Sequence, residues 1–322
     1  MNKFHVLVVD KLNDAGQSQF DARDDVKTTV LQFATEEELI AHAHDIDAIA
    51  VQTTKIPRAV IEAAPNLKVV SRHGVGYDSV DVAALTERGI PLCVAATSNA
   101  VSVAEHTMYF ILALAKKSVE FDHATRNDNF WIKRQMGAQD IADKSVLLVG
   151  FGRIGTRVAK RALAFDMRVS VIDPFVDDET IKAAGCTPVK NLDAVLPQMD
   201  FVSLHCPKSP ETVNLMGKAQ FAAMKPTAHV INTARGGMVD EDALYDALTS
   251  GAIAGAGIDV FASEPPKPEH PLFQLDNIIV SPHSAGVTEQ SILRMASQTA
   301  ENVLNVLDGK PNPDTVINKE VL

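Results

Sequence analysis

Short apolar runs alternate with segments of helical periodicity along the whole chain. The early runs are FHVLVV, AIAVQ, LKVVS and PLCVA, and a later series comprises SVLLVG, RVSVID, FVSLH, HVINT, GAGIDV and NIIVS. Strands that are buried on both faces by crossover helices read as continuous apolar runs of this kind. The pattern therefore predicts an α/β protein with two doubly wound parallel-sheet domains.

Two helical segments are expected to connect these domains. SVAEHTMYFILALAKK begins with Ser102 and Glu105 in capping-box spacing, and EQSILRMASQTAENVLNVLDG closes with Gly309, a natural C-cap. If the second helix packs back on the first domain, the chain crosses between the domains twice. We therefore expect a discontinuous first domain of residues 1–100 plus 288–322 and a second domain of residues 101–287.

Composition excludes several classes of protein. The chain has 322 residues, of which 46% are apolar and 22% charged, as in a soluble globular protein of roughly two domains. A net charge of −11 without a lysine-arginine cluster argues against nucleic acid or an anionic membrane as partner. The scattered Cys93, Cys186 and Cys206 fit a reduced, cytoplasmic protein. The N-terminal run and MYFILALA are too short for a signal peptide or a membrane span.

The stretch KSVLLVGFGRIGTRVAKRALAFDMRVSVIDP contains a dinucleotide-binding fingerprint. Gly150, Gly152 and Gly155 follow an apolar run in G-x-G-x-x-G spacing, and Asp173 comes at the end of the next run. The first glycine permits a tight turn, the second lets the backbone approach a pyrophosphate, and the third allows close helix–strand packing. Because strand, helix, second strand and acidic residue are all present, the sequence predicts a nucleotide site here.

The same stretch indicates which dinucleotide is bound. The amides of Arg153 and Ile154 are expected to meet the phosphate charge at the helix start. Asp173 is expected to accept hydrogen bonds from the adenosine ribose. A carboxylate at this place repels a 2′-phosphate, and PFVDDE adds further acids instead of an arginine. NAD is therefore the expected cofactor, rather than NADP.

Each of the last three apolar runs is followed by residues that bear charge. HVINTARGG contains Arg235, GAGIDVFASEP contains Asp259 and Glu264, and NIIVSPH contains His283 after Pro282. Ligands of open α/β sheets bind beyond the carboxyl ends of the strands, so these side chains are expected to converge. An arginine can hold a carboxylate, and a histidine with a carboxylate beside it can pass a proton near neutral pH. Singly, each residue also fits a structural role in a loop or turn.

The segments RHGVGYDSVD, SNAVSVAEH, GFGRIG, LHCPKSPET, INTARGGMVDEDAL, DVFASEP and SPHSAG are highly specific in combination. On them the chain resembles the D-2-hydroxyacid dehydrogenases of the phosphoglycerate dehydrogenase–hydroxypyruvate reductase type over nearly its whole length. The resemblance implies a Rossmann NAD domain and a smaller, flavodoxin-like substrate domain. It also implies a homodimer, formed through the crossover helix and the NDNFWIKRQMG arm around Trp131.

The resemblance further implies roles for individual residues. Arg235, Glu264 and His283 match the catalytic arginine, glutamate and histidine of the family. Val75 and Gly76 match the loop whose amides meet the substrate carboxylate, while Arg235 and His283 also contact the substrate. The resemblance assigns contacts with the nicotinamide amide to Thr233, Ala234 and Asp259. It assigns contacts on the adenosine side of the cofactor to His205, Cys206 and Pro207.

Other polar residues are assigned structural roles. His42 and His44 are two residues apart in an expected helix and so lie on different faces, which is poor geometry for a metal. No residue cluster suggests a metal site. His106 lies in the crossover helix and is expected to be packed rather than catalytic, and Cys206 has no evident base partner.

The expected reaction is reversible hydride transfer between NAD(H) and C2 of a small 2-keto or D-2-hydroxy acid. Phosphoglycerate enzymes usually carry an Arg-Ser pair where this chain has Gln52 and Thr53, and many append a regulatory domain after the point where this sequence ends. Both differences favour an unphosphorylated substrate such as hydroxypyruvate or glyoxylate. D-3-phosphoglycerate stays an alternative, because Lys55, Arg72 and Lys133 are candidates to supply charge to a phosphate.

Two other classes resemble the chain in outline. Formate dehydrogenases carry glutamine beside the histidine, so Glu264 argues against them. NAD-sensing transcriptional corepressors keep the same three catalytic-type residues but have a disordered C-terminal tail, which this sequence is expected to lack. A corepressor-like binding protein is therefore the non-enzyme alternative.

Overall fold

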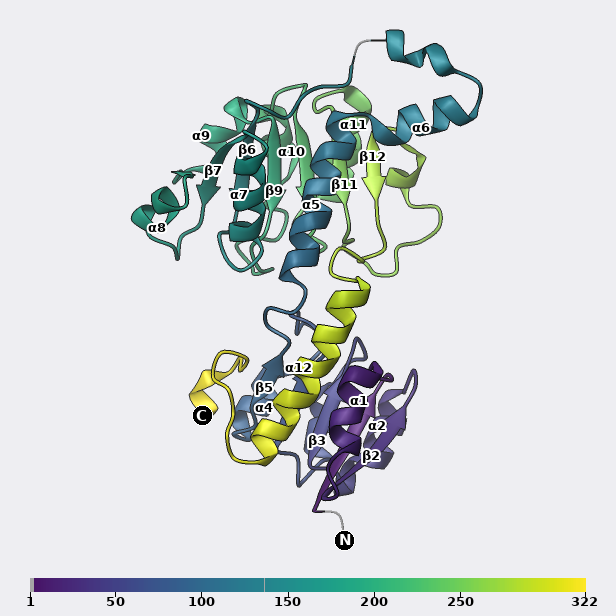
Figure 1. Cartoon of the computed structure of the whole chain (residues 1–322), viewed down its shortest axis with the longest axis vertical. Coiled ribbons are helices and arrows are strands. Elements are labelled where there is room, and N and C mark those ends of the chain that lie inside the picture. The colour runs from purple at the N-terminus through teal and green to yellow at the C-terminus, as the bar shows by residue number, and fades with distance from the viewer. Residues whose placement is uncertain (1–2, 136) are drawn as a thin grey trace. The chain divides into compact units, whose positions relative to one another are not determined.

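A computed structural model describes residues 3–135 and 137–322 of the chain (Figure 1). Met136, within the predicted NDNFWIKRQMG arm, lies outside the described residues. The chain divides into two compact units, one of Met1–Asn99 with Val287–Leu322 and the other of Ala100–Gly286. Each unit is built on its own parallel sheet.

The first unit has a sheet in the order β2-β1-β3-β4-β5, with all neighbouring strands parallel. This is the flavodoxin-like strand order. Its elements are β1 Phe4–Val9, α1 Asp14–Asp21, β2 Val26–Leu31, α2 Glu36–His42, a 3₁₀ turn Ala43–Asp45, β3 Ala48–Val51, α3 Arg58–Glu62, β4 Val69–Arg72, α4 Val82–Glu87, β5 Leu92–Val94, α12 Glu289–Leu307 and a 3₁₀ turn Lys319–Val321.

Helices cover both faces of this sheet, as the alternation of β1 side chains shows. Leu7 and Val9 pack in one core cluster with residues of α2, α3 and α4, whereas Val6 and Val8 pack in another with residues of α1 and α12. The C-terminal helix α12 therefore completes the first unit. It ends as expected, because Gly309 has a φ of +71° and donates its amide to the Val306 carbonyl.

The second unit has a parallel sheet in the order β12-β11-β10-β9-β6-β7-β8. This is the Rossmann order with one further strand at the β12 edge. Its elements are α5 Ala100–Ala115, α6 Ser118–Arg126, a 3₁₀ turn Phe130–Arg134, β6 Ser145–Val149, α7 Gly155–Ala164, β7 Arg168–Ile172, α8 Asp178–Ala183, β8 Thr187–Pro188, α9 Leu192–Val195, a 3₁₀ turn Leu196–Gln198, β9 Phe201–Leu204, α10 Lys218–Ala223, β10 His229–Asn232, α11 Glu241–Ser250, β11 Gly255–Ile258, a 3₁₀ turn Pro271–Gln274 and β12 Ile278–Val280.

Both faces of the second sheet are also covered (Figure 1). Leu147 and Val149 of β6 pack with residues of α10 and α11, whereas Val146 and Leu148 pack with residues of α5 and α7. Successive side chains of a strand point to opposite faces, so a run that is apolar at every position requires two covers. The predicted fold class, a Rossmann unit and a smaller flavodoxin-like unit, is confirmed.

Three local features depart from expectation. The strand β2 (VKTTVL) is absent from the expected set, because it lies at a sheet edge and most of its side chains are partly or fully exposed. The two-residue strand β8 is too short to give a pattern. The expected capping box is wrong, because α5 begins at Ala100 and Ser102 is its third residue. In the described ranges, no helix combines the length and apolar character needed to cross a bilayer.

Candidate active site

The glycines of the fingerprint lie between β6 and α7, and two of them are fixed by the protein itself. Gly150 has a φ of +103°, and a Cβ atom there would lie 2.7 Å from the amide nitrogen of Cys206. A Cβ atom on Gly155 would collide with the Gly150 carbonyl. Only glycine therefore permits this turn and the close approach of α7.

Gly152 differs from its neighbours because it faces open space. An ideal Cβ atom on it would meet no heavy atom within 4 Å. No neighbouring protein atom therefore requires glycine at this position, whereas the close approach of a pyrophosphate to the backbone would require it. Arg153 and Ile154 directly precede α7 on the same turn, so the loop fits a dinucleotide.

Asp173 follows β7 and touches this loop. Its Oδ2 atom accepts a hydrogen bond from the Phe151 amide at 2.7 Å, and its Oδ1 atom accepts one from the Phe175 amide at 2.8 Å. A carboxylate offers about four lone-pair sites, so two bonds leave capacity for ribose hydroxyls. The carboxylate therefore lies beside the glycine loop, and its contact with a ribose stays a prediction.

The His205–Pro207 segment forms another wall of the loop. The backbone of His205 and Cys206 lies against Gly150, and the His205 Nε2 atom is 2.9 Å from the Ser203 hydroxyl. Burial lowers the pKa of His205 to about 3, so its ring is neutral. Burial, and then the charge of Asp173, raise the pKa of the Cys206 thiol to about 11. A protonated thiol agrees with a lining role rather than a nucleophilic one.

The structure brings the predicted catalytic residues to one edge of the second sheet. Arg235, Glu264 and His283 follow β10, β11 and β12, which are adjacent parallel strands. The Nδ1 atom of His283 lies 2.7 Å from the Oε2 atom of Glu264, and the other oxygen of Glu264 accepts the Phe261 amide at 3.0 Å. The His283 side chain is 49% exposed, so its ring can meet a ligand.

Glu264 is held as a carboxylate. Partial burial alone would raise its pKa, but hydrogen bonds from His283 and the Phe261 amide, together with the charges of His283 and Arg235, lower it overall. The side chain therefore presents a negative charge to the imidazole throughout the neutral range. Arg235, whose charge contributes to this lowering, follows β10, the strand next to β11.

Asn232, the last residue of β10, orders the loop that carries Arg235. Its amide nitrogen donates to the Arg235 carbonyl at 2.9 Å and its oxygen accepts the Ala234 amide at 3.0 Å. A Cβ atom on Gly236 would collide with the Phe261 carbonyl, so the loops after β10 and β11 are in contact. Sequence reasoning missed Asn232, although an asparagine that closes an apolar run was a signal.

Two predicted nicotinamide contacts are buried here. Thr233 is buried, with its hydroxyl 2.9 Å from the hydroxyl of Thr107. Asp259 is buried and accepts hydrogen bonds from the Ser281 hydroxyl and from the Ser284 and Ala285 amides, at 2.8 and 3.0 Å. Asp259 thus holds the loop after β12, and its role toward nicotinamide stays a prediction.

Val75 and Gly76 belong to the first unit, in the loop that follows β4. The preceding Gly74 has a φ of +129° and its carbonyl accepts the Ala95 amide at 2.9 Å, which ties the loop to the end of β5. The substrate-binding role expected of Val75 and Gly76 stays a prediction. Within the residues that the structure describes, no three histidine, cysteine or acidic side chains are grouped to hold a metal ion.

Comparisons with known proteins agree on one family. The sequence model of the family described as "D-isomer specific 2-hydroxyacid dehydrogenase, NAD binding domain" matches residues 108–285, which lie within the second unit. The chain is 38% identical over 307 residues to a D-3-phosphoglycerate dehydrogenase of Archaeoglobus fulgidus. That alignment covers 95% of this chain but 58% of the archaeal protein.

Two further relatives match along most of their own length. A glyoxylate reductase of Thermofilum pendens is 40% identical over 292 residues, covering 89% of this chain and 85% of that protein. The crystal structure of an NADPH-dependent glyoxylate/hydroxypyruvate reductase from Sinorhizobium meliloti superposes with a TM-score of 0.87 at 27% identity, covering 98% of both chains.

Proposed function

This chain belongs to the D-isomer specific 2-hydroxyacid dehydrogenase family, and we propose that it transfers hydride reversibly between NAD(H) and C2 of a small 2-keto or D-2-hydroxy acid. The observation that carries the proposal is the 2.7 Å contact between His283 Nδ1 and Glu264 Oε2, at the sheet edge where Arg235 also lies.

Each of these residues has a chemical task in the proposed reaction. NAD, when bound, supplies or accepts the hydride. Arg235 binds the substrate carboxylate through its planar guanidinium. Because Glu264 occupies Nδ1 of His283, the Nε2 atom donates a proton to the carbonyl oxygen during reduction and takes it back during oxidation. The Glu264 carboxylate stabilises the protonated ring, and acid–base catalysis of this kind contributes about 10²–10⁴-fold in rate.

We infer an unphosphorylated substrate such as hydroxypyruvate or glyoxylate. Gln52 and Thr53 follow β3 in the first unit and carry no charge. The Gln52 side-chain amide donates to the Lys11 carbonyl at 2.7 Å, so it is engaged with the loop that follows β1. The name of the Thermofilum pendens relative supports this inference.

D-3-phosphoglycerate is the alternative substrate. Several relatives at 37–38% identity bear the name D-3-phosphoglycerate dehydrogenase, although this chain spans only 54–60% of their length. A phosphate would require cationic partners, and Lys55, Arg72 and Lys133 are the candidates.

Oxidation of NADH by the purified chain tests the proposal. The panel comprises hydroxypyruvate, glyoxylate, pyruvate and 3-phosphohydroxypyruvate, each also measured with NADPH. We expect turnover of hydroxypyruvate or glyoxylate and, because of Asp173, a preference for NADH. Turnover of 3-phosphohydroxypyruvate alone would overturn the substrate inference. No turnover of any acid, with NADH still bound, would contradict the enzyme and favour an NAD-sensing, corepressor-like protein.

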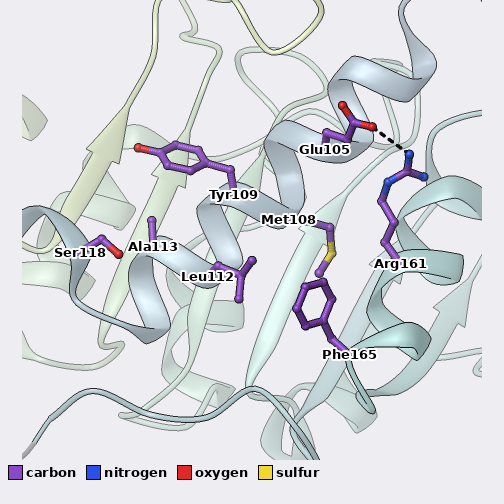
Figure 2. A pocket seen from close by; sticks show the side chains of 8 residues that line it. All are labelled: Glu105, Met108, Tyr109, Leu112, Ala113, Ser118, Arg161 and Phe165. Atoms are coloured by element: carbon purple, nitrogen blue, oxygen red, sulfur yellow. Dashed lines mark hydrogen bonds and ion pairs between the residues drawn. The ribbon is translucent and has the colours of Figure 1, made fainter.

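We further propose that the chain forms a homodimer through the outer face of α5. A cavity of about 450 Å³ lies on this face. Figure 2 shows Met108 beside Phe165 at this cavity, and Glu105 paired with Arg161; the Arg161 Nη2 and Glu105 Oε1 atoms are 3.1 Å apart. Large apolar side chains are exposed nearby in the chain: Tyr109 at 49%, Phe130 at 57% and Trp131 at 58%. Exposed apolar area of this kind marks protein interfaces.

Light scattering coupled to size-exclusion chromatography tests the dimer. We expect a dimer at micromolar concentration and a monomer after the change Tyr109→Glu, because the charge would be buried at the interface. A monomeric parent chain would contradict the proposal.

A further inference from the structure

His106, on α5, is in contact with the loop that carries His283. Its Nε2 atom lies 3.0 Å from the hydroxyl of Ser281, which is 175 residues away in sequence. The Ser281 hydroxyl in turn donates to Oδ1 of Asp259. All three side chains belong to the second unit, and the proposed reaction assigns no task to His106 or Ser281.

The positions of the protons follow from what each group can donate. An ionised carboxylate only accepts hydrogen bonds, and a serine hydroxyl has one proton to give. Since Ser281 donates that proton to Asp259, the Ser281 oxygen must accept from His106, whose proton is therefore on Nε2. Burial lowers the pKa of His106 despite the opposing charge of Asp259, so the ring is neutral at pH 7. The hydrogen bonds run from His106 to Ser281 to Asp259.

Asp259 connects this chain of hydrogen bonds to the backbone around His283. Its carboxylate accepts the Ser284 and Ala285 amides, and its carbonyl accepts the His283 amide at 2.7 Å. His283 itself has a φ of +53°, a conformation that few residues other than glycine adopt. Such a conformation persists only where surrounding bonds hold it, and here Asp259 provides them.

His106 is well placed to support this arrangement. Its ring packs edge-on against Phe110, with centroids 4.5 Å apart and an interplanar angle of 78°. Phe110 is fully buried and lies in the core between α5 and the sheet. The imidazole is therefore held from both sides, by an aromatic ring and by Ser281.

We propose that His106 and Ser281 are positioning residues which, through Asp259, hold the 281–285 loop so that the His283 ring stays aligned with Glu264. The inference rests on the proposed function for its kinetic consequence, since His283 is the proton donor there. A residue of α5 thereby joins the residues that determine kcat.

Replacements that break or keep the hydrogen bond test the proposal. Ser281→Ala and His106→Phe remove it, whereas His106→Gln keeps an N–H donor near the place of Nε2. We expect the first two to lower kcat at least about tenfold with KM for the keto acid changed less than about threefold, because misalignment affects the reacting geometry. We expect His106→Gln to stay within about threefold of the parent. A double variant, H106F with S281A, should be no worse than S281A alone.

His229→Phe is the matched control. His229 is a buried histidine at the first residue of β10, the opposite end of the strands from His283, and stacks on Phe201. The kcat of H229F should stay within about twofold of the parent while the thermal stability of the variant falls. An equal loss of kcat in this variant, additive losses in H106F with S281A, or unchanged kcat in both S281A and H106F would each overturn the proposal.

NMR of histidine-labelled protein separates this inference from the proposed reaction. The titration of the His283 ring can be followed whether or not any acid is turned over. If the whole substrate panel fails, the proposed function fails, but a His283 titration curve that is altered in S281A and H106F and close to the parent's in H106Q still supports the positioning chain. A curve identical in the parent and S281A overturns it.

Discussion

The Nδ1 atom of His283 lies 2.7 Å from the Oε2 atom of Glu264, although 19 residues separate them in sequence. The second oxygen of Glu264 is held by the Phe261 amide, so the carboxylate cannot turn away without losing a bond. The contact leaves Nε2 as the only ring nitrogen of His283 that remains for a substrate. It therefore fixes both the charge next to the ring and the atom that exchanges the proton.

Replacing Glu264 by glutamine should shift the pH profile of the reductive reaction. Because the pKa of Glu264 is lowered, the parent keeps its carboxylate ionised at neutral pH, and this charge favours a protonated His283. Reduction needs that proton, so the fall of kcat/KM with rising pH should begin at a lower pH in E264Q than in the parent. Superimposable profiles for parent and variant would contradict the role of Glu264.

Replacing His283 by alanine should abolish most turnover but leave NADH binding intact. The variant loses the proton donor, which contributes about 10²–10⁴-fold in kcat. Steady-state rates and fluorescence titration with NADH measure the two effects separately. His123→Ala, a change in the exposed helix α6, is the control and should have parental rates. Unchanged turnover in H283A would exclude His283 as the acid.

Two glycines of the fingerprint should respond differently to alanine. Gly152→Ala should keep the free energy of unfolding within about 0.5 kcal/mol, since its Cβ atom meets no neighbour, yet weaken NADH binding at least about tenfold. Gly155→Ala should lower the free energy of unfolding by about 1–3 kcal/mol, because the added atom collides with the Gly150 carbonyl. Denaturant unfolding and NADH titration distinguish these cases, and parental NADH affinity in G152A would contradict the assignment.

Asp200→Asn should destabilise the second unit in a pH-dependent way. The carboxylate of Asp200 accepts the amide and hydroxyl of Ser145 and pairs with Lys225, all at 2.8 Å. Burial would raise its pKa, but these bonds lower it below the unfolded value. Because the pKa of Asp200 is lower in the folded chain than in the unfolded chain, the ionised carboxylate stabilises the fold at pH values above its pKa in the unfolded chain, near 4. This stabilisation is lost as the pH falls through its pKa in the folded chain.

The expected loss in D200N is about 1–3 kcal/mol at pH 7, shrinking as the pH falls below about 4. Urea unfolding followed by circular dichroism measures it. Asp140→Asn, which removes an exposed partner of Lys116, should cause no measurable change. If D200N lost the same free energy of unfolding at pH 7 and below pH 4, the charge of Asp200 would not be the cause of the loss.

The sequence by itself determined the fold class and the chemistry available at the site. Runs such as SVLLV require cover on both faces, and Gly150, Gly155 and Asp173 have backbone and charge requirements that are local. A parallel sheet also places the carboxyl ends of adjacent strands at one edge. That was enough to predict that Arg235, Glu264 and His283 share that edge.

Only the tertiary structure decided which partners these residues have. The bonds from Asp259 to the 281–285 loop and from His106 to Ser281 are absent from any local pattern. The edge strand β2 likewise gives no apolar run, because most of its side chains are partly or fully exposed, although its valines and threonines favour a strand. Side-chain hydrogen bonds depend on distances of a few tenths of an ångström between segments that only packing brings together, and periodicity carries no such information.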